Sequence, residues 1–245
     1  MDRSDVQALV LAGGLGKRLR AAYANGPKSL APVGGRPFLD YLMRWLQISG
    51  FSDIVLCVGY KTEQIQERYQ DGRHWGLRIS YSLEKEPLGT AGAIKNAEVL
   101  LQVDTFLVLN GDSFTDVPLR ELIQFHRRRK WLATLTLAPA PEESRYGSVR
   151  MNASGEILGF LEKDSGGAMD DKRGRRWING GVYAFQKELL SVIPPGRPVS
   201  LETEIFPQLV GHRFCGFPTD GYFIDIGVPA DYRRAQKEFR ERFSR

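Results

Sequence analysis

Residues 6–19, VQALVLAGGLGKRL, give the strongest indication of the fold. The first six of these residues form a short, continuous apolar run, which predicts a buried parallel strand. The three glycines that follow let the backbone approach an anion closely, and successive amide groups there can cradle phosphate oxygens. Arg18 adds a planar fork of donors that suits phosphate. We therefore predict a phosphate-binding loop after the first strand, with a tight turn that carries incidental charges as the alternative.

This loop differs from two widespread phosphate-binding patterns. The pattern GxxxxGK[ST] is absent, and Gly14-x-Gly16 lacks the third glycine of a dinucleotide-binding fingerprint. Lys28 follows shortly afterwards. A lysine is normally a solvated surface residue, but after such a loop it is also a candidate second cation for a triphosphate.

Strand and helix patterns alternate through the first half of the chain. The strand patterns cover residues 6–11, 54–58, 77–83 and 106–109, and the helix patterns cover 37–49, 62–69 and 89–101. A repeating βαβ order implies a mostly parallel sheet with helices on both faces. The predicted fold class is therefore α/β, with a doubly wound, Rossmann-like sheet.

The second half of the chain changes character, with several strand patterns in succession. Strands are predicted at 133–137, 147–151, 155–161, 177–185 and 223–226, helices at 118–126, 201–210 and 229–243, and a polar, glycine-rich loop at 164–176. Gly180 and Gly181 break the strand at 177–185, and Ser200 is the expected N-cap of the next helix. No linker or repeat separates the halves, so we expect one domain over residues 1–245.

The composition excludes several classes of protein. The chain has 245 residues, of which 42% are hydrophobic and 26% charged, which rules out a disordered chain, a collagen or a coiled coil. Cys57 and Cys215 are flanked by apolar residues and are expected to be buried, reduced thiols. No apolar run approaches the roughly 20 residues of a membrane-spanning helix, and the short one near the N-terminus runs into glycines. We therefore expect neither a membrane span nor a signal peptide, and a cytoplasmic location.

The net charge of +5 could serve nucleic acid, an anionic membrane or a small polyanionic substrate. The dense basic run at 127–130 ends a helix pattern and is interpreted as a solvated helix end, where cations suit the helix dipole. Neither nucleic acid nor a membrane is therefore expected as a partner. The three histidines, at 74, 126 and 212, are scattered, so zinc is not expected.

Two aspartates follow predicted strands. Asp112 comes after FLVLNG, and Asp225 lies in FIDIG. Open α/β sheets bind ligands at the carboxyl ends of their strands, and Mg²⁺ is commonly held by one or two carboxylates plus substrate phosphates and water. The two aspartates could share one Mg²⁺ if the fold brings them together. Taken singly, each could instead cap a turn.

Nine segments resemble, in order, the sugar-1-phosphate nucleotidyltransferases (pyrophosphorylases) that make NDP-sugars. They are LAGGLGKRL, PKSLAPVGGRPFLDYL, EPLGTAGAI, VLNGDSFTD, YGSV, FLEK, NGGVYAF, SLETEIFPQL and FIDIGVPADY. Each is weak alone, but together they cover nearly the whole chain. Within the family, SLETEIFP and YFIDIGVPADY look most like the D-glycero-α-D-manno-heptose 1-phosphate guanylyltransferases. Mannose-1-phosphate guanylyltransferases and short uridylyltransferases are the alternatives.

The resemblance implies a glycosyltransferase-A-like nucleotidyltransferase fold with a nucleotide-binding half (about 1–117) and a sugar-phosphate-binding half (about 118–245). The implied nucleotide site comprises Leu11, Ala12, Gly13, Gly14, Gly16, Lys17, Arg18, Lys28, Glu84, Gly89 and Thr90. The implied sugar-phosphate site comprises Asp112, Tyr146, Gly147, Glu162, Lys163, Asn179, Gly180 and Glu202. Asp112 and Asp225 would bind Mg²⁺, and the implied catalytic residues are Arg18, Lys28, Asp112, Lys163 and Asp225.

Some of these residues also have simpler interpretations. Asn179-Gly180-Gly181 could be a bulge in a strand, and Glu202 could be a favourable charge at a helix start. The chain departs from the family where Lys17 replaces the usual Thr or Ser, and where the loop lacks a proline that often follows. Both departures bear on the geometry of phosphate binding.

The implied reaction is in-line attack by a sugar-1-phosphate oxygen on the α-phosphorus of an NTP, releasing pyrophosphate without a covalent enzyme intermediate. GTP is expected, because guanine offers N–H donors at N1 and N2 and Glu84 could accept both. A solvated strand end is the alternative for Glu84. The rival classes are a non-catalytic sugar-nucleotide sensor and a basic nucleic-acid-binding protein. The sequence does not fix the oligomeric state, and a homodimer is compatible with it.

Overall fold

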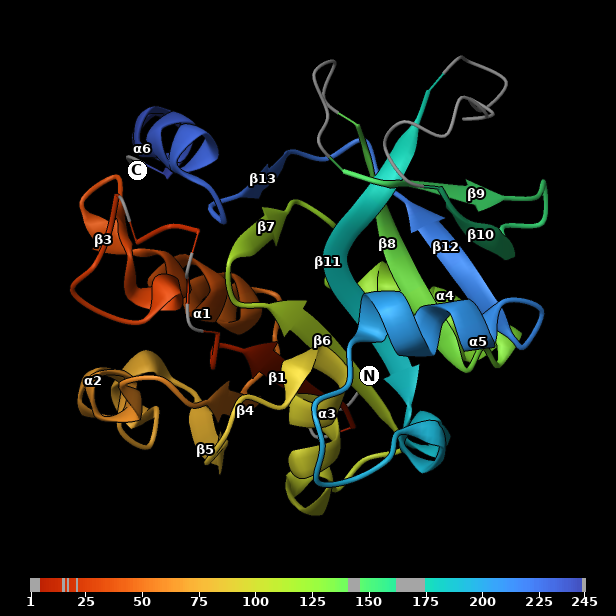
Figure 1. The fold of residues 1–245 in the computed structure, drawn as a ribbon, viewed down its shortest axis with the longest axis horizontal. Coiled ribbons are helices and arrows are strands. Elements are labelled where there is room, and N and C mark those ends of the chain that lie inside the picture. The colour runs from red at the N-terminus through yellow and green to blue at the C-terminus, as the bar shows by residue number, and fades with distance from the viewer. Residues whose placement is uncertain are drawn as a thin grey trace.

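A computed structural model describes residues 5–14, 16, 18–20, 22–140, 146–161 and 175–243. A nine-stranded sheet forms its centre, in the order β10-β9-β11-β6-β1-β4-β5, with β8 paired to β11 and β12 paired to β8 (Figure 1). The strands are β1 (Gln7–Leu11), β4 (Asp53–Val58), β5 (Arg78–Leu83), β6 (Thr105–Asn110), β8 (Ala133–Pro139), β9 (Ser148–Met151), β10 (Ile157–Leu161), β11 (Trp177–Gln186) and β12 (Phe214–Pro218). Two small sheets join β2 (Pro32–Val33) to β3 (Arg36–Pro37) and β7 (Ser113–Thr115) to β13 (Phe223–Asp225).

The sheet changes character between the two halves of the chain. β6, β1, β4 and β5 are parallel neighbours, as the alternating strand and helix patterns predict. β11 then runs antiparallel to β6 on one side and to β8 on the other. The predicted α/β, doubly wound sheet is confirmed, with antiparallel strands added by the second half.

Helices cover both faces of the sheet. They are α1 (Phe38–Ile48), α2 (Thr62–Tyr69), α3 (Gly89–Asn96), α4 (Leu119–Arg129), α5 (Phe206–Leu209) and α6 (Pro229–Phe243). α1 buries an apolar stripe that includes Phe38, Leu42 and Leu46, at the spacing of one helix face. That stripe belongs to one core with residues of α2, α4 and α6. Residues of α3 and α5 belong to a second core on the other face.

Several boundaries differ from the prediction. β11 is continuous through Gly180 and Gly181, and its pairing with β8 shifts between Asn179 and Tyr183, so the expected break is a bulge. Gly181 adopts a φ of +73°, which favours glycine. Strand β12 was not predicted from the sequence. The predicted loop at 164–176 lies outside the described residues except for its last two positions.

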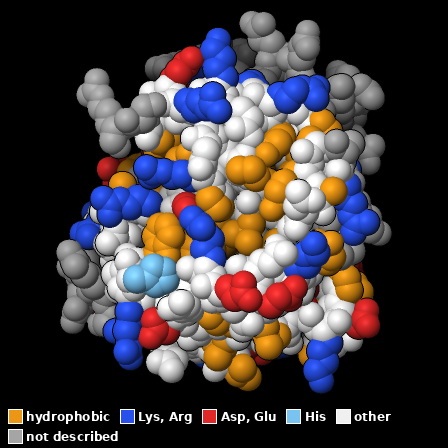
Figure 2. Space-filling model, turned by 90° about the vertical axis from the view of Figure 1, so that its left-hand side faces the viewer, with side chains coloured by type: hydrophobic (Ala, Val, Ile, Leu, Met, Phe, Trp, Pro, Cys, Tyr) orange, Lys and Arg blue, Asp and Glu red, His pale blue; other side chains and the backbone are white. Residues whose placement is uncertain are grey.

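The expectations for the two cysteines and for the basic run are confirmed. Cys57 and Cys215 are buried and free, and burial raises the pKa of both thiols. The basic run ends α4, where Lys130 is the C-cap. No helix among the described residues is long and apolar enough to cross a membrane. On the face that Figure 2 shows, Lys and Arg side chains are spread among apolar and acidic groups.

Candidate active site

The candidate site lies where β1 and β6 end side by side. Leu11 and Asn110 are register partners, and the Gly111 N–H donates to the Leu11 carbonyl at 3.0 Å. A Cβ on Gly111 would stand 2.5 Å from that carbonyl oxygen, so only glycine permits this close approach. The chain therefore turns sharply after each strand, and Asp112 follows at the carboxyl edge where such sheets bind ligands.

Pairing between distant segments brings the two predicted metal ligands together. Ser113 and Asp225 are register partners in the antiparallel pair β7-β13, and the Ile226 N–H donates to the Asp112 carbonyl at 2.9 Å. The Asp225 carboxylate also accepts the Gly227 N–H at 2.5 Å and the Tyr146 hydroxyl at 3.2 Å. The two aspartates thus occupy one site, although 112 positions separate them in sequence.

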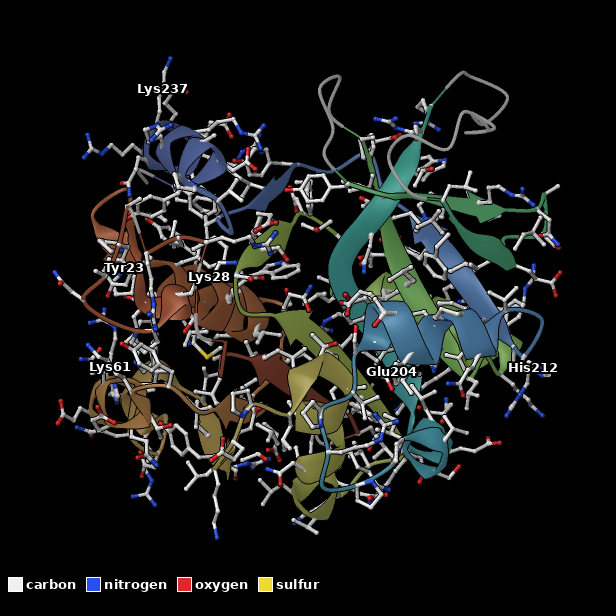
Figure 3. All side chains as sticks on the ribbon, viewed as in Figure 1. Tyr23, Lys28, Lys61, Glu204, His212 and Lys237 are labelled. Carbon is white, nitrogen blue, oxygen red and sulfur yellow. The ribbon has the colours of Figure 1, made fainter. Side chains whose placement is uncertain are left out.

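Lys28, labelled in Figure 3, lies within ion-pairing distance of both carboxylates. Its Nζ donates to Asp112 Oδ2 and stands 3.9 Å from Asp225 Oδ1. Lys28 is buried. A Cβ on Gly16 would lie 3.1 Å from the Cβ of Lys28, so the glycine loop packs against the lysine side chain. The ammonium of Lys28, predicted to be a second cation for a triphosphate, therefore contacts the carboxylates in this structure.

The position of the Lys28 ammonium shows that a divalent cation would fit between the carboxylates of Asp112 and Asp225. One cation already contacts one carboxylate and lies within ion-pairing distance of the other, so their oxygens converge on a common position. Two carboxylates completed by phosphate and water are a usual Mg²⁺ environment. Among the described residues no group of three or more His, Cys, Asp or Glu side chains gathers. The two aspartates fit a cation that takes its remaining ligands from substrate and water.

Glu84 lies beside the glycine loop. Its Oε2 accepts the Leu88 N–H at 3.0 Å, and a Cβ on Gly13 would stand under 3.0 Å from its Oε1. Burial raises the pKa of the Glu84 carboxyl, and the hydrogen bond from Leu88 lowers it in part. Glu84 is therefore half-buried and engaged with the loop at 87–90, and is not a freely solvated strand end.

Thr90 and Glu202, which were assigned to different substrates, are hydrogen-bonded to each other. Thr90 Oγ1 donates to Glu202 Oε2 at 2.9 Å and accepts the Leu201 N–H at 2.7 Å. Ser200 Oγ accepts the Thr203 N–H at 3.2 Å, which confirms the predicted N-cap. The hydrogen bonds of Thr90 tie the start of α3 to the helical turn Leu201–Ile205, which leads into α5.

A cavity of about 820 Å³ opens beside the aspartates. Among the predicted site residues it is lined by Arg18, Asp112, Tyr146, Gly147, Asn179, Glu202 and Asp225. Gly180 does not line it, because its backbone faces Thr136 and Thr115 across the sheet; Gly181 lines it instead. Gly13, Glu84 and Thr90 also lie outside the lining. Lys17, Glu162 and Lys163 lie outside the described residues.

The sequence did not identify four polar residues that line this cavity, namely Asn110, Ser113, Ser148 and Thr203. Asn110 is the last residue of β6, and Ser113 is the first residue of β7. Both flank Gly111-Asp112 in the segment VLNGDSFTD. The signal was available, since a polar residue that ends an otherwise apolar strand beside a predicted metal ligand lies at the same sheet edge.

Comparison with known proteins shows which family the chain belongs to. The family "Nucleotidyl transferase" matches it over residues 7–242. The chain belongs to this family. It is 39% identical over 234 residues to a D-glycero-alpha-D-manno-heptose 1-phosphate guanylyltransferase of Aneurinibacillus thermoaerophilus, covering 95% of this chain and 98% of that protein. It is 34% identical to a mannose-1-phosphate guanylyltransferase of Mycobacterium tuberculosis, covering 97% of this chain and 66% of that longer protein.

A solved structure agrees with these sequence relatives. HddC from Yersinia pseudotuberculosis, complexed with GMP-PN, matches this nucleotidyl transferase with a TM-score of 0.81 and 31% identity, covering 95% of this chain and 99% of that one. The resemblance inferred from the nine segments is confirmed. The chain is a nucleotidyltransferase enzyme. The division into nucleotide and sugar-phosphate halves stays a prediction.

Proposed function

We propose that this enzyme transfers the guanylyl group of GTP to D-glycero-α-D-manno-heptose 1-phosphate, releasing pyrophosphate and forming GDP-heptose. The observation that carries the proposal is the convergence of Lys28, Asp112 and Asp225 beside a cavity that the two aspartates line together with Arg18. Relatives named as heptose 1-phosphate guanylyltransferases, 39% and 37% identical over most of the chain, support the choice of substrates.

The chemistry requires two polyanions to meet. A sugar-phosphate oxygen forms a bond to the α-phosphorus, and the bond from that phosphorus to the bridging oxygen of pyrophosphate breaks. The attacking phosphate oxygen is already deprotonated, so no general base is needed. Catalysis is then positioning and charge neutralisation. Arg18 faces the cavity with a guanidinium suited to phosphate, and Lys28 supplies a buried ammonium at the junction with the aspartates.

Asp112 and Asp225 are the residues that would hold Mg²⁺. When bound, the ion supplies positive charge to the triphosphate. The chain's own contribution is to hold both carboxylates rigidly, through the β7-β13 pairing and the Gly227 N–H bonded to Asp225. We further propose, from the family resemblance, that Lys163 orients the attacking phosphate and Glu162 contacts the sugar.

Glu84 is proposed to favour guanine in two ways. A carboxylate offers about four acceptor positions, and the Leu88 N–H occupies one of them. The remaining positions can accept the N1 and N2 hydrogens of guanine. The bond to Leu88 also fixes the loop at 87–90 beside the base.

Mannose 1-phosphate is the second candidate sugar, because a mannose-1-phosphate guanylyltransferase matches 97% of this chain. A pocket that accommodates the extra carbon of a heptose still admits mannose, since a missing group costs little unless a buried polar partner is left unpaired. Measurable but weaker turnover with mannose 1-phosphate is therefore expected.

The test is pyrophosphate release over a matrix of NTPs and sugar 1-phosphates. The proposal expects GTP with the heptose 1-phosphate to give the highest kcat/KM. A preference for UTP or CTP would contradict the guanylyl assignment, and a strong preference for mannose 1-phosphate would favour the second candidate. Nucleotide-sugar binding without pyrophosphate release from any pair would instead indicate a non-catalytic sensor.

A further inference from the structure

Two buried oxygen atoms at the cavity wall have no hydrogen-bond partner among the described residues. They are Oδ1 of Asn110 and Oγ of Ser113, and both residues line the cavity. A buried polar atom left without a partner costs about 1–3 kcal/mol, so such atoms normally have one. Of the buried side-chain atoms that lack a partner among the described residues, only these two belong to residues that line the cavity, so a bound ligand is the group expected to supply the missing hydrogen bonds.

The Asn110 side chain is held in a fixed orientation. Its Nδ2 donates to the Tyr183 hydroxyl at 3.3 Å, and that hydroxyl also accepts from Asn179 Nδ2 at 3.0 Å. Asn179 Oδ1 in turn accepts the Gly181 N–H at 2.8 Å. Tyr183 is fully buried. A chain of hydrogen bonds therefore runs from the β11 bulge to Asn110 and leaves Asn110 Oδ1 free.

The same series of hydrogen bonds changes the role of Asn179. The sequence resemblance assigns this residue to the sugar, but both ends of its amide are engaged, by Gly181 and by Tyr183. Asn179 lines the cavity, yet its hydrogen bonds are directed at the protein. Asn110 carries the free atom, and Asn179 with Tyr183 positions it.

The β11 bulge also brings Ser113 and Asn110 together. A Cβ on Gly181 would lie under 3.0 Å from Ser113 Oγ and 3.1 Å from Asn110 Nδ2, so both side chains pack on this glycine. The absence of a side chain at Gly181 therefore leaves room for the Ser113 hydroxyl and the Asn110 amide group on the same side of the bulge.

The chemistry of the two atoms selects a hydroxyl. A carboxamide oxygen only accepts hydrogen bonds and repels the oxygens of a phosphate, whereas a serine hydroxyl can donate. A sugar hydroxyl can donate to Asn110 Oδ1 and accept from Ser113 Oγ. Of the implied nucleotide-site residues only Arg18 is among the described residues that line this cavity. Tyr146, Gly147 and Glu202 of the implied sugar-phosphate site also line it, so the sugar is the substrate expected there.

We propose that Asn110, assisted by Ser113, binds one ring hydroxyl of the sugar 1-phosphate, and that Asn179 and Tyr183 position Asn110 for this contact. The inference rests on the proposed function and names the residue that reads the sugar. Asn110 is then a determinant of sugar specificity, and the β11 bulge exists to present it.

The test pairs substrate analogues with variants. Initial rates are measured at saturating GTP with D-mannose 1-phosphate and with its 2-, 3- and 4-deoxy analogues. With the wild type, loss of the hydroxyl that Asn110 binds should lower kcat/KM about 10- to 100-fold, because a buried acceptor is left unpaired. With Asn110→Ala, kcat/KM for D-mannose 1-phosphate should fall by a similar factor. The same deoxy analogue should lower kcat/KM no further in this variant, and the KM for GTP should not change.

Three further variants separate contact from structure. Asn110→Ser is a smaller polar replacement, for use if the alanine variant folds poorly, and should also lose the hydroxyl sensitivity. Tyr183→Phe removes only the anchoring hydroxyl and should raise the KM for the sugar while leaving the KM for GTP unchanged. Asn96→Ala is the matched control, because that amide donates to Ser82 outside the cavity and its loss should leave hydroxyl sensitivity intact.

The outcomes distinguish the two claims. Full hydroxyl sensitivity in both folded Asn110 variants, or a loss that falls equally on GTP and sugar in the Tyr183 variant, would overturn the inference and leave the proposed function standing. Absence of wild-type turnover with every sugar 1-phosphate would overturn the proposed function itself.

Discussion

Replacing Lys28 with methionine should destabilise the metal-free enzyme and make its stability depend on Mg²⁺. The Lys28 side chain is 10% exposed, whereas those of Asp112 and Asp225 are 38% and 18% exposed. Breaking a fully buried ion pair costs about 3–5 kcal/mol and an exposed one about 0–1 kcal/mol. The partly exposed Lys28 cluster lies between these limits, so we expect a loss of about 2 kcal/mol, or about 4–8 °C in Tm for a chain of this length.

The assay is thermal unfolding of both proteins with EDTA and with excess Mg²⁺. A divalent cation can replace the lost charge between the carboxylates, so Lys28→Met should gain more stability from Mg²⁺ than the wild type, whose ammonium already contacts Asp112. Lys95→Met is the matched control, because Lys95 is also largely buried and pairs with Glu98 at 2.7 Å, away from the site. The control should lose stability without gaining a response to Mg²⁺. Equal Mg²⁺ responses in the wild type and Lys28→Met would show that Mg²⁺ does not take the position of the Lys28 ammonium between the carboxylates.

Four further predictions concern single residues. Asp225→Asn should nearly abolish turnover without unfolding the protein, because an amide lacks the carboxylate charge; near-normal turnover at limiting Mg²⁺ would remove it from the metal site. Glu84→Gln should reduce the preference for GTP over other NTPs while leaving sugar selectivity unchanged, and a shift in sugar selectivity would argue against its role beside the base. Lys163→Met should weaken use of the sugar phosphate about 10- to 100-fold while sparing NTP binding, and the reverse pattern would assign it to the nucleotide. Burial, with a smaller contribution from Arg127, lowers the pKa of His126 to about 4, below its ordinary value of 6.5. Since the folded state holds His126 neutral, stability is retained above pH 6.5 and should fall by up to about 3 kcal/mol as the pH drops towards 4. Denaturant titrations across that range should show a shallower fall for His126→Gln, and identical slopes would exclude His126 as the cause.

Local patterns were sufficient to predict most of the elements. The helix patterns at 62–69 and 229–243 coincide with α2 and α6, because each has clear termini and one apolar face. Strand β12 was missed because FCGFP contains a glycine and a proline, which weaken a strand pattern, and only its pairing with β8 makes it a strand. The antiparallel insertion of β11 beside β6 is likewise a long-range outcome.

The site shows the same division. The sequence placed Asp112 and Asp225 each at the end of a strand, but their convergence depends on the β7-β13 pairing, which no local pattern encodes. The position of Lys28 between them also depends on tertiary packing. Asn110 was missed because a polar residue at a strand end is common, and its significance depends on the hydrogen bond to Tyr183 and the unpaired oxygen that only the structure reveals.

Transfer of the guanylyl group of GTP to a sugar 1-phosphate can be followed with an isotope in the α-phosphate. The enzyme is incubated with GTP radiolabelled at the α-phosphorus, Mg²⁺ and D-glycero-α-D-manno-heptose 1-phosphate, and labelled products are separated while pyrophosphate is measured in parallel. We expect label to appear in GDP-heptose, one pyrophosphate to be released per labelled product, and both to require the sugar phosphate. Pyrophosphate release without the sugar phosphate, label retained on the protein, or no labelled nucleotide sugar would contradict it.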